Sequence, residues 1–300
     1  MKQVLMTGAS GFLGHYFLDV YSKMDSKVFK IGRDQSNDLV CDLSSESPEI
    51  PIKIYDQVIY AAGKAHFLPK TEAEKKEFFD VNVTGLKNFL ESIEKSEIAQ
   101  FVLISTVAVY GCDSGVKLDE NTALLATDPY GRSKIEAEKI AIQWCKNRNI
   151  PILVLRLPLV AGSNPSGNLK AMADGLRKNR YFRIGNGNNR KSVVLAEDVA
   201  VFCSKLSSKA EGIYHLTDDD DPTFSEIDGH LAQQLKVKRI HSLPFWTVKI
   251  LAKIGDFFGK KAPINSNRLM KMTSTLTFSC EKAKRELNWN PRKTIEINYL

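Results

Sequence analysis

The sequence predicts an α/β protein with a doubly wound parallel sheet, followed by a smaller mixed α/β region. Two observations support this fold class. Short apolar runs alternate with segments of helical periodicity in the first half of the chain, as in parallel strands joined by right-handed crossovers. A glycine-rich turn also links the first apolar run to the first helical segment. We expect one part over residues 1–160 and a second over 161–300, interleaved with the first.

The glycine-rich turn runs from Met6 to Gly14, after the apolar run 2–5 and before a helix. Gly8 lets the chain turn sharply off the strand, Gly11 lets backbone N–H groups approach a pyrophosphate, and Gly14 permits close helix–strand packing. Strand, turn and helix in this order predict the dinucleotide-binding start of a Rossmann-like sheet. The contacts predicted here are Gly8, Ser10, Gly11, Phe12, Leu13 and Gly14.

The end of the second predicted strand, 27–31, indicates which dinucleotide binds. An acidic residue at this place usually holds the ribose 2′-OH of NAD, whereas a nearby arginine accommodates the 2′-phosphate of NADP. Gly32 and Arg33 follow the strand directly, and Asp34 comes one step later. This order favours NADP with Arg33 as a phosphate ligand, and NAD held by Asp34 is the alternative.

The run 38–43 predicts a third strand that reaches the nucleotide. Asp42, next to Leu43 at the end of this run, would either accept a hydrogen bond from the adenine amine or cap a turn. We include both residues among the predicted cofactor contacts.

The buried run 56–63 predicts a fourth strand that ends in small residues. Small side chains at this end let the backbone pass close beneath a nucleotide. Residues 71–96 follow with helical periodicity, and Asn82 lies on their apolar face, as a structural hydrogen-bonding group or as part of a proton relay. The cofactor contacts predicted from these segments are Ala61, Ala62, Gly63 and Asn82.

The catalytic chemistry is predicted after the fifth strand, 101–104. Tyr130 and Lys134 open the helical segment 129–149 and, four residues apart, share one of its faces. A free tyrosine has a pKa near ~10, and a nearby lysine ammonium lowers this pKa by favouring the phenolate. The pair would exchange a proton with a substrate hydroxyl or carbonyl, while Thr106 orients the same oxygen.

Composition narrows the class of protein. The chain has 300 residues, 43% of them hydrophobic, which is enough for one large or two linked domains. No apolar run approaches the ~18 residues of a membrane span, and we expect no secretory signal. Five scattered cysteines without a C-x-x-C pair predict neither disulfides nor a metal site, and indicate a reduced, cytoplasmic protein. The net charge of +7 is spread along the chain, so we expect no nucleic-acid partner.

Together these motifs resemble the extended short-chain dehydrogenase/reductase family. The resemblance covers nearly the whole chain, and the second half is similar to the nucleotide-sugar 4-epimerase and 4-ketoreductase branch. In that family the N-terminal part binds the dinucleotide and the smaller C-terminal part binds a nucleoside-diphosphate sugar. The segments that carry the resemblance are Thr7–Gly14, Ala61–Gly63, Asn82–Gly85, Ser105–Gly111, Tyr130–Lys134, Arg156–Val160, Gly167–Leu169, Asn189–Val194 and Leu287–Pro291.

The resemblance implies roles for individual residues. Tyr130 is the general acid/base, Lys134 activates it and binds the nicotinamide ribose, and Thr106 lies near the sugar oxygen. The 4,6-dehydratases of the family carry Asp-Glu where Val107 and Ala108 stand here, so we do not expect elimination of water. The substrate contacts expected are Ser105, Asn168, one of Arg190 and Lys191, and, with a solvated surface position as the alternative, Arg268 and His66.

The resemblance implies hydride transfer at C4 of a UDP-linked sugar. Reduction of a 4-keto-6-deoxy sugar is our first expectation, and a 4-epimerase such as a UDP-glucose 4-epimerase is the alternative, since the same residues serve both. A non-catalytic dinucleotide sensor or an RNA-binding scaffold is a further class, which the intact Tyr130, Lys134 and Thr106 argue against. We also allow for a homodimer.

Two further segments carry unusual patterns. The run Asp218–Asp221 before a proline predicts an exposed turn that caps the helix from Phe224. The segment 244–258 predicts a basic amphipathic helix with Trp246, Ile250, Ile254 and Phe257 at helical spacing. Such a helix would either lie on a membrane surface or, as we favour, pack beside the substrate cleft.

Overall fold

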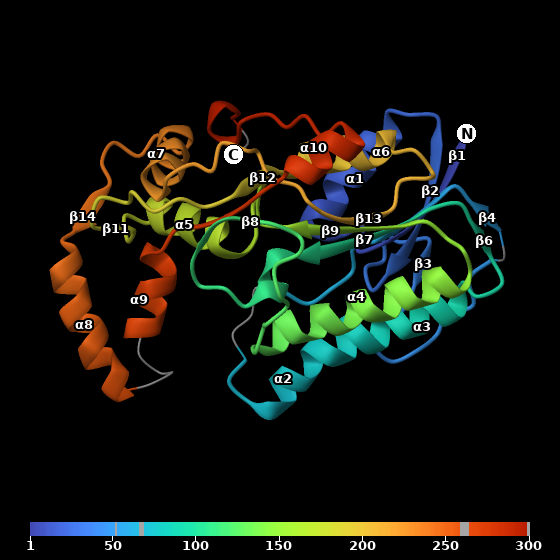
Figure 1. Ribbon diagram of the computed structural model, residues 1–300, viewed down its shortest axis with the longest axis horizontal. Coiled ribbons are helices and arrows are strands. Elements are labelled where there is room, and N and C mark those ends of the chain that lie inside the picture. Colours follow the sequence, from blue (N-terminus) through green and yellow to red (C-terminus); the bar gives the residue numbers. More distant parts are fainter. Residues whose placement is uncertain (52, 66–68, 259–263, 299–300) are drawn as a thin grey trace.

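The computed structural model describes residues 1–51, 53–65, 69–258 and 264–298 (Figure 1). Its centre is a seven-stranded sheet whose paired strands are all parallel. The order across the sheet is β13 (Gly212–His215), β9 (Ile152–Leu157), β7 (Phe101–Thr106), β5 (Gln57–Tyr60), β1 (Lys2–Thr7), β2 (Ser26–Gly32) and β3 (Leu39–Val40). The predicted parallel sheet is confirmed.

Helices cover both faces of this sheet, as Figure 1 shows. One face carries α1 (Phe12–Ser22), α6 (Ala196–Lys205) and α10 (Glu281–Leu287), and the other carries α2 (Glu72–Phe79), α3 (Gly85–Ser92) and α4 (Pro129–Asn147). Each face has its own core: Val4, Met6 and Phe17 belong to one, and Leu5, Phe89 and Ala137 to the other. Two cores on one sheet are the doubly wound arrangement.

Three elements differ from their predicted extent. The fourth strand is β5, which ends at Tyr60, before the small residues 61–63. The third strand is only the residue pair Leu39–Val40, because Asp42 already begins a turn in which its carboxylate accepts hydrogen bonds from Ser44. The helix predicted over 71–96 is divided, since a π-helical turn η1 (Asp80–Thr84) separates α2 from α3. Such turns are rare and are frequently found at functional sites, and this one contains Asn82.

The remaining elements are small sheets and helices beside the large sheet. Residues beyond 160 also return to the large sheet as α6, β13 and α10. The parallel pairs are β10 (Leu159–Ala161) with β12 (Val193–Leu195), β11 (Phe182–Ile184) with β14 (His241–Leu243), β8 (Gly115–Leu118) with β15 (Leu276–Phe278), and β4 (Ile54–Tyr55) with β6 (Glu97–Ile98). The other helices are η2 (Val107–Tyr110), α5 (Gly167–Arg177), α7 (Phe224–Gln234), α8 (Phe245–Phe258), α9 (Ser266–Thr273) and η4 (Thr294–Glu296).

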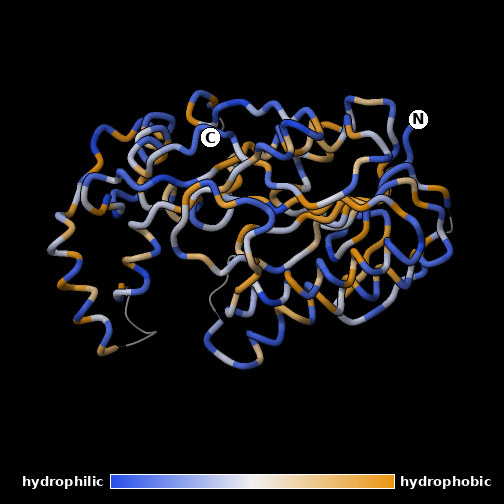
Figure 2. The backbone as a smooth tube through the Cα atoms, viewed as in Figure 1, coloured by the Kyte–Doolittle hydropathy of each residue, from blue (hydrophilic) through white to orange (hydrophobic). Residues whose placement is uncertain are grey.

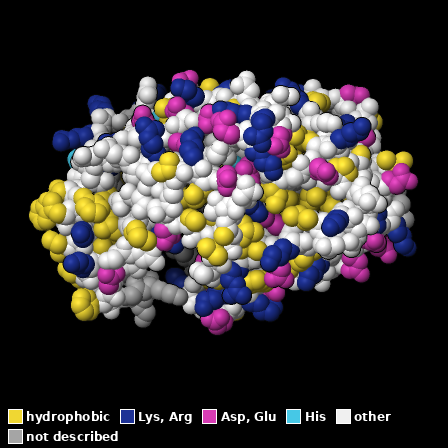
Figure 3. All heavy atoms as spheres, viewed as in Figure 1, with side chains coloured by type: hydrophobic (Ala, Val, Ile, Leu, Met, Phe, Trp, Pro, Cys, Tyr) yellow, Lys and Arg dark blue, Asp and Glu magenta, His cyan; other side chains and the backbone are white. Residues whose placement is uncertain are grey.

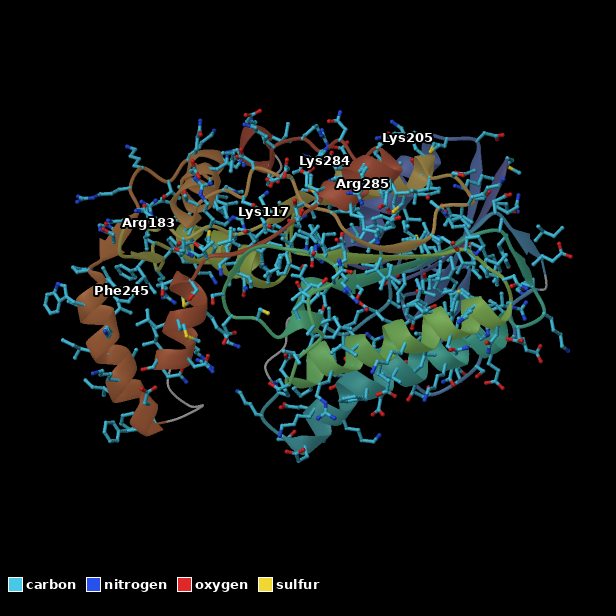
Figure 4. The ribbon with its side chains drawn as sticks, in the orientation of Figure 1. Lys117, Arg183, Lys205, Phe245, Lys284 and Arg285 are labelled. Carbon is cyan, nitrogen blue, oxygen red and sulfur yellow. The ribbon has the colours of Figure 1, made fainter. Side chains whose placement is uncertain are left out.

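The acidic run Asp218–Asp221 before α7 is not the exposed capping turn that the sequence predicted. Asp218 and Asp221 are buried, and it is Thr223 that caps α7 through its side chain. Asp221 accepts a hydrogen bond from Ser192 and lies 2.9 Å from the Lys117 ammonium, while Lys117 and Lys284 both pair with Asp219 (Figure 4). The run is therefore a partly buried ion-pair junction, on which lysines from distant elements converge.

Hydrophobic residues are concentrated along the central strands and recur along α8 (Figure 2). Within the described ranges, no helix combines the length and the hydrophobicity that crossing a membrane requires. The predicted amphipathic helix is α8, and the four apolar residues that define its pattern are all more than half exposed. Its buried residues are instead the small or β-branched Val248, Ala252 and Gly255.

Candidate active site

The glycine-rich turn brings two predicted cofactor segments together. Gly8 has a left-handed φ of +74°, and a Cβ there would lie 2.6 Å from the backbone of Ala61 and Ala62. A Cβ on Gly14 would lie 2.2 Å from the Gly8 carbonyl oxygen. The end of β5 and the start of α1 can therefore approach the turn only because these positions lack side chains.

The start of α1 is suited to an anion. Among the described residues, no side chain caps this helix, and its first main-chain bond runs from His15 N to Gly11 O. The N–H groups of the first turn, including Phe12 and Leu13, thus lack intrahelical acceptors and point outward with the positive end of the helix dipole. The cradle that glycine creates at this helix start fits the pyrophosphate of a dinucleotide.

The end of β2 carries the two residues expected to distinguish NADP from NAD, Arg33 and Asp34. Both are exposed, but the Asp34 carboxylate accepts hydrogen bonds from Ser36, at 2.8 Å from N and 2.6 Å from Oγ. The Ser36 hydroxyl, followed by its N–H, holds the Asp34 pKa below its usual value. Asp34 thus caps its own turn, and Arg33 is the cation at this strand end.

Three predicted cofactor residues serve the protein's own packing. The Asp42 carboxylate caps the turn at Ser44, which is one of the two roles expected for it, and the Leu43 side chain is buried in the core. The Asn82 amide accepts from Lys64 N at 2.7 Å and donates to Lys64 O at 3.1 Å and to Ser133 Oγ at 2.9 Å. Because its hydrogen-bonding groups are engaged in this way, Asn82 fixes the chain after Gly63 against α4.

Local sequence places Tyr130 at the carboxyl end of β7. Asp128 caps α4 by accepting from Gly131 N at 3.0 Å, and Pro129 occupies the first turn, which suits its fixed φ. A Cβ on Gly131 would lie 2.4 Å from the Ala126 Cβ and 2.9 Å from the Ala108 carbonyl, so glycine permits close contact between α4 and η2. This contact sets Tyr130 beside Thr106, as predicted.

Tyr130 is held as a neutral phenol. Burial raises its pKa to about 12, and a hydrogen bond with Thr106 acts in the opposite direction. The lowering that we expected from Lys134 is not found, because burial dominates and the Lys134 ammonium donates to the Ile104 carbonyl oxygen at 2.7 Å. Burial also lowers the pKa of Lys134 to about 8.

A buried polar network beneath this site was missed from the sequence. The Glu138 carboxylate accepts from the Ser105 hydroxyl and from the Arg156 guanidinium, which also donates from Nη1 to Tyr110 Oη at 2.8 Å. Tyr110 Oη lies 2.5 Å from His215 Nε2. The expected substrate contact of Ser105 is corrected, since its hydroxyl faces Glu138 in the interior. The only signal was that Glu138 follows Lys134 by one helical turn, on the same face.

The predicted substrate residues are distributed around α5 and α9. Arg190 Nη1 donates to the Asp221 carbonyl at 2.8 Å, so its guanidinium supports the acidic junction. Lys191 Nζ lies 3.2 Å from the Lys271 carbonyl on α9, which also carries Arg268, and burial lowers the Lys191 pKa. Asn168 is exposed at the start of α5. His66 lies outside the described residues.

Comparison with known proteins agrees with this geometry. The NAD dependent epimerase/dehydratase family matches residues 4–216. A UDP-glucose 4-epimerase of Vibrio cholerae is 26% identical, over 99% of this chain and 93% of that protein. An N-acetyl-alpha-D-glucosaminyl-diphospho-ditrans,octacis-undecaprenol 4-epimerase of Escherichia coli O157:H7 is also 26% identical, over 93% and 88% of the two chains.

Solved structures share the fold. A UDP-glucose 4-epimerase of Thermotoga maritima with UDP-glucose has a TM-score of 0.72 at 17% identity, over 98% of this chain and 95% of that one. RMD of Pseudomonas aeruginosa complexed with NADPH has a TM-score of 0.74 at 17% identity, over 98% and 96%. The protein is an NAD(P)-dependent enzyme. With a match over more than two thirds of its length, the chain belongs to the NAD dependent epimerase/dehydratase family.

Proposed function

We propose that the protein transfers hydride at C4 of a UDP-linked sugar, and that it reduces the carbonyl of a 4-keto-6-deoxy sugar. The observation that carries this proposal is the position of Tyr130 beside Thr106, at the same sheet edge as the glycine-rich turn. Open α/β sheets place their ligands at this edge. A phenol that keeps its proton is suited to protonating a carbonyl oxygen as that carbonyl is reduced.

Each residue has a distinct part in this chemistry. Tyr130 donates its proton to the sugar O4, and Thr106 orients that oxygen. Lys134 holds the nicotinamide ribose and stabilises the tyrosinate left by proton transfer. The bound dinucleotide supplies the hydride, so the chain supplies orientation and electrostatics.

For the cofactor we propose NADP. Arg33 is an exposed cation at the end of β2, and the Asp34 carboxylate is engaged by Ser36. This arrangement favours a 2′-phosphate over a ribose 2′-OH that needs a carboxylate acceptor. A reductase must also exchange its spent nucleotide at each turnover, whereas an epimerase regenerates its own.

On the substrate side we propose that Lys191 and Asn168 contact the diphosphate region and that Arg268 adds a second cation. Lys191 supports this assignment because its ammonium reaches α9, the helix that carries Arg268. Arg190 supports the acidic junction instead.

A 4-epimerase is the second candidate. Two relatives at 26% identity are named as 4-epimerases, one for UDP-glucose and one for a sugar on diphospho-undecaprenol. The same residues would serve, with hydride returned to the opposite face of the sugar.

One experiment separates the candidates. The purified protein is incubated with a UDP-4-keto-6-deoxy sugar and NADPH, and in parallel with UDP-glucose without added nucleotide. Consumption of NADPH with formation of the 4-hydroxy sugar supports the reductase. Interconversion of UDP-glucose and UDP-galactose without added nucleotide contradicts it and identifies an epimerase. Tyr130→Phe is the control in both assays and is expected to be inactive.

A further inference from the structure

Helix α8 has two apolar faces and packs only one of them onto the protein. Val248, Ala252 and Gly255 are buried, and Val248 and Ala252 form a small core with Leu269 of α9. These positions recur at spacings of four and three residues, so they form a single stripe along the helix.

The second face is exposed and carries larger side chains. With 3.6 residues per turn, the six large apolar residues of this face occupy an arc of roughly 140° on the side away from the buried stripe. Figure 3 shows hydrophobic side chains gathered over α8, and Figure 4 labels Phe245 at the beginning of this helix. The members are Trp246 (65% exposed), Ile250 (52%), Leu251 (53%), Ile254 (51%), Phe257 (92%) and Phe258 (67%).

The chain around this face is basic. Between residues 236 and 258 the only acidic side chain is Asp256, and it accepts hydrogen bonds from Ser266 N and Oγ at 2.9 and 2.6 Å. Two lysines, Lys249 and Lys253, border the apolar arc on α8 itself. The exposed cations of the segment are Lys236, Lys238, Arg239, Lys249 and Lys253.

We propose that this α8 surface, the six exposed apolar side chains with Lys249 and Lys253 at their border, docks onto an anionic lipid bilayer. An apolar helix face rich in Trp and Phe enters the boundary between headgroups and acyl chains, while neighbouring lysines contact anionic headgroups. The inference goes beyond the proposed reaction and does not rest on it.

The geometry favours a bilayer over a second copy of the chain. Helix α8 lies at one end of the molecule (Figure 1), and the exposed apolar side chains all project from this single helix. The surface is therefore convex, and a fluid bilayer accommodates protruding rings without a matching groove. A second copy on this face would bring the same bordering lysines, Lys249 and Lys253, near one another, which is unfavourable. Anionic headgroups are complementary to them.

Vesicle sedimentation tests the proposal. The full chain is mixed with vesicles of phosphatidylcholine alone, or with about one third phosphatidylglycerol. The test variant is the triple change Trp246→Ser, Ile250→Ser and Phe257→Ser. The matched control makes three exposed apolar residues elsewhere polar, namely Met24→Ser, Val116→Ser and Leu125→Ser. Because all six side chains are exposed, both variants should fold, which thermal unfolding checks.

We expect the unchanged chain and the control to bind the anionic vesicles at least about tenfold more strongly than the test variant, and more weakly at high salt. Lys249→Gln with Lys253→Gln should reduce binding on anionic vesicles alone. Equal binding of control and test variant would overturn the proposal. So would self-association that depends on this face, seen by analytical ultracentrifugation without vesicle binding. Vesicle sedimentation does not depend on catalytic activity, so its result can be interpreted even if the proposed reaction is not found.

Discussion

The Glu138 carboxylate accepts hydrogen bonds from Arg156 at 2.7 Å from Nη2 and 3.1 Å from Nε, and both side chains are almost completely buried. One turn earlier on α4, the Lys134 ammonium donates to the Ile104 carbonyl oxygen of β7 at 2.7 Å. The ion pair thus fixes α4 to β9 behind the helix turn that carries Tyr130 and Lys134, and through Ser105 it holds the end of β7.

Glu138→Gln should destabilise the fold by about 3–5 kcal/mol, because it leaves the Arg156 charge buried without its counter-ion. The measurement is chemical unfolding. Asp19→Asn is the matched control, since Asp19 pairs with Lys23 at the same 2.7 Å but both side chains are more than half exposed. That change should cost under about 1 kcal/mol. Equal losses of unfolding free energy in the two variants would show that the buried ion pair stabilises the fold no more than the exposed one.

Tyr130→Phe should lower turnover at least ~100-fold, because the variant lacks the proton that the phenol donates. Dinucleotide affinity, measured by calorimetry, should be nearly unchanged, since the ring and its contact with Phe78 remain. Undiminished turnover would refute the assigned role of Tyr130.

The sequence was sufficient for the fold and for the residues whose role depends on the backbone. Local backbone geometry determines the positions of Gly8 and Gly14 and the shared helix face of Tyr130 and Lys134. Their placement could therefore be predicted. The order of the strands and the two-sided core follow from the alternation of strands and helices.

The features that could not be predicted depend on contacts between residues that are far apart in the sequence. Ser105 was expected to face the substrate, but Glu138, 33 residues away, takes its hydroxyl. Asp221 was expected to be exposed, but Ser192 and Lys117 bury it. The local pattern of α8 left open whether its large apolar face packs on the protein, and only the structure shows that small residues form the buried stripe.

Lys191→Ala should weaken binding of a UDP-sugar by roughly 10–100-fold, as expected for the loss of a charge-assisted hydrogen bond to the diphosphate. Binding of the free sugar, measured by calorimetry, should change little. Arg190→Ala is the comparison: because its guanidinium bonds the Asp221 carbonyl, it should lower thermal stability more than it lowers affinity. Equal weakening of UDP-sugar and free sugar by Lys191→Ala would mean that Lys191 is structural.

Stability should fall as the pH decreases from about 6.5 to about 4, because of His215. Burial lowers the pKa of this histidine from 6.5 to about 4, with the Ser279 carbonyl acting against the shift. The unfolded chain therefore binds a proton over this interval and the folded chain does not, so protonation favours unfolding, by at most about 3 kcal/mol.

Unfolding measured across this pH range checks the histidine's contribution. His215→Gln should reduce the slope of the unfolding free energy against pH. His241→Gln, at an exposed position, should leave this slope unchanged. An unchanged slope in His215→Gln would assign the pH dependence to other groups.

The preference for NADPH over NADH should depend on Arg33. Arg33→Ala removes the exposed cation at the end of β2, so the variant should lose ~1.5–3 kcal/mol of binding to NADPH, the range for a hydrogen bond to a charged group. Affinity for NADH should change little, because that cofactor has no 2′-phosphate. Arg285→Ala, an exposed arginine paired with Glu286, is the control and should bind both nucleotides normally. If instead the protein releases NAD+ on denaturation and Asp34→Ala, but not Arg33→Ala, weakens binding, the carboxylate holds the ribose. In that case the cofactor is NAD, and the 4-epimerase becomes the better supported reaction.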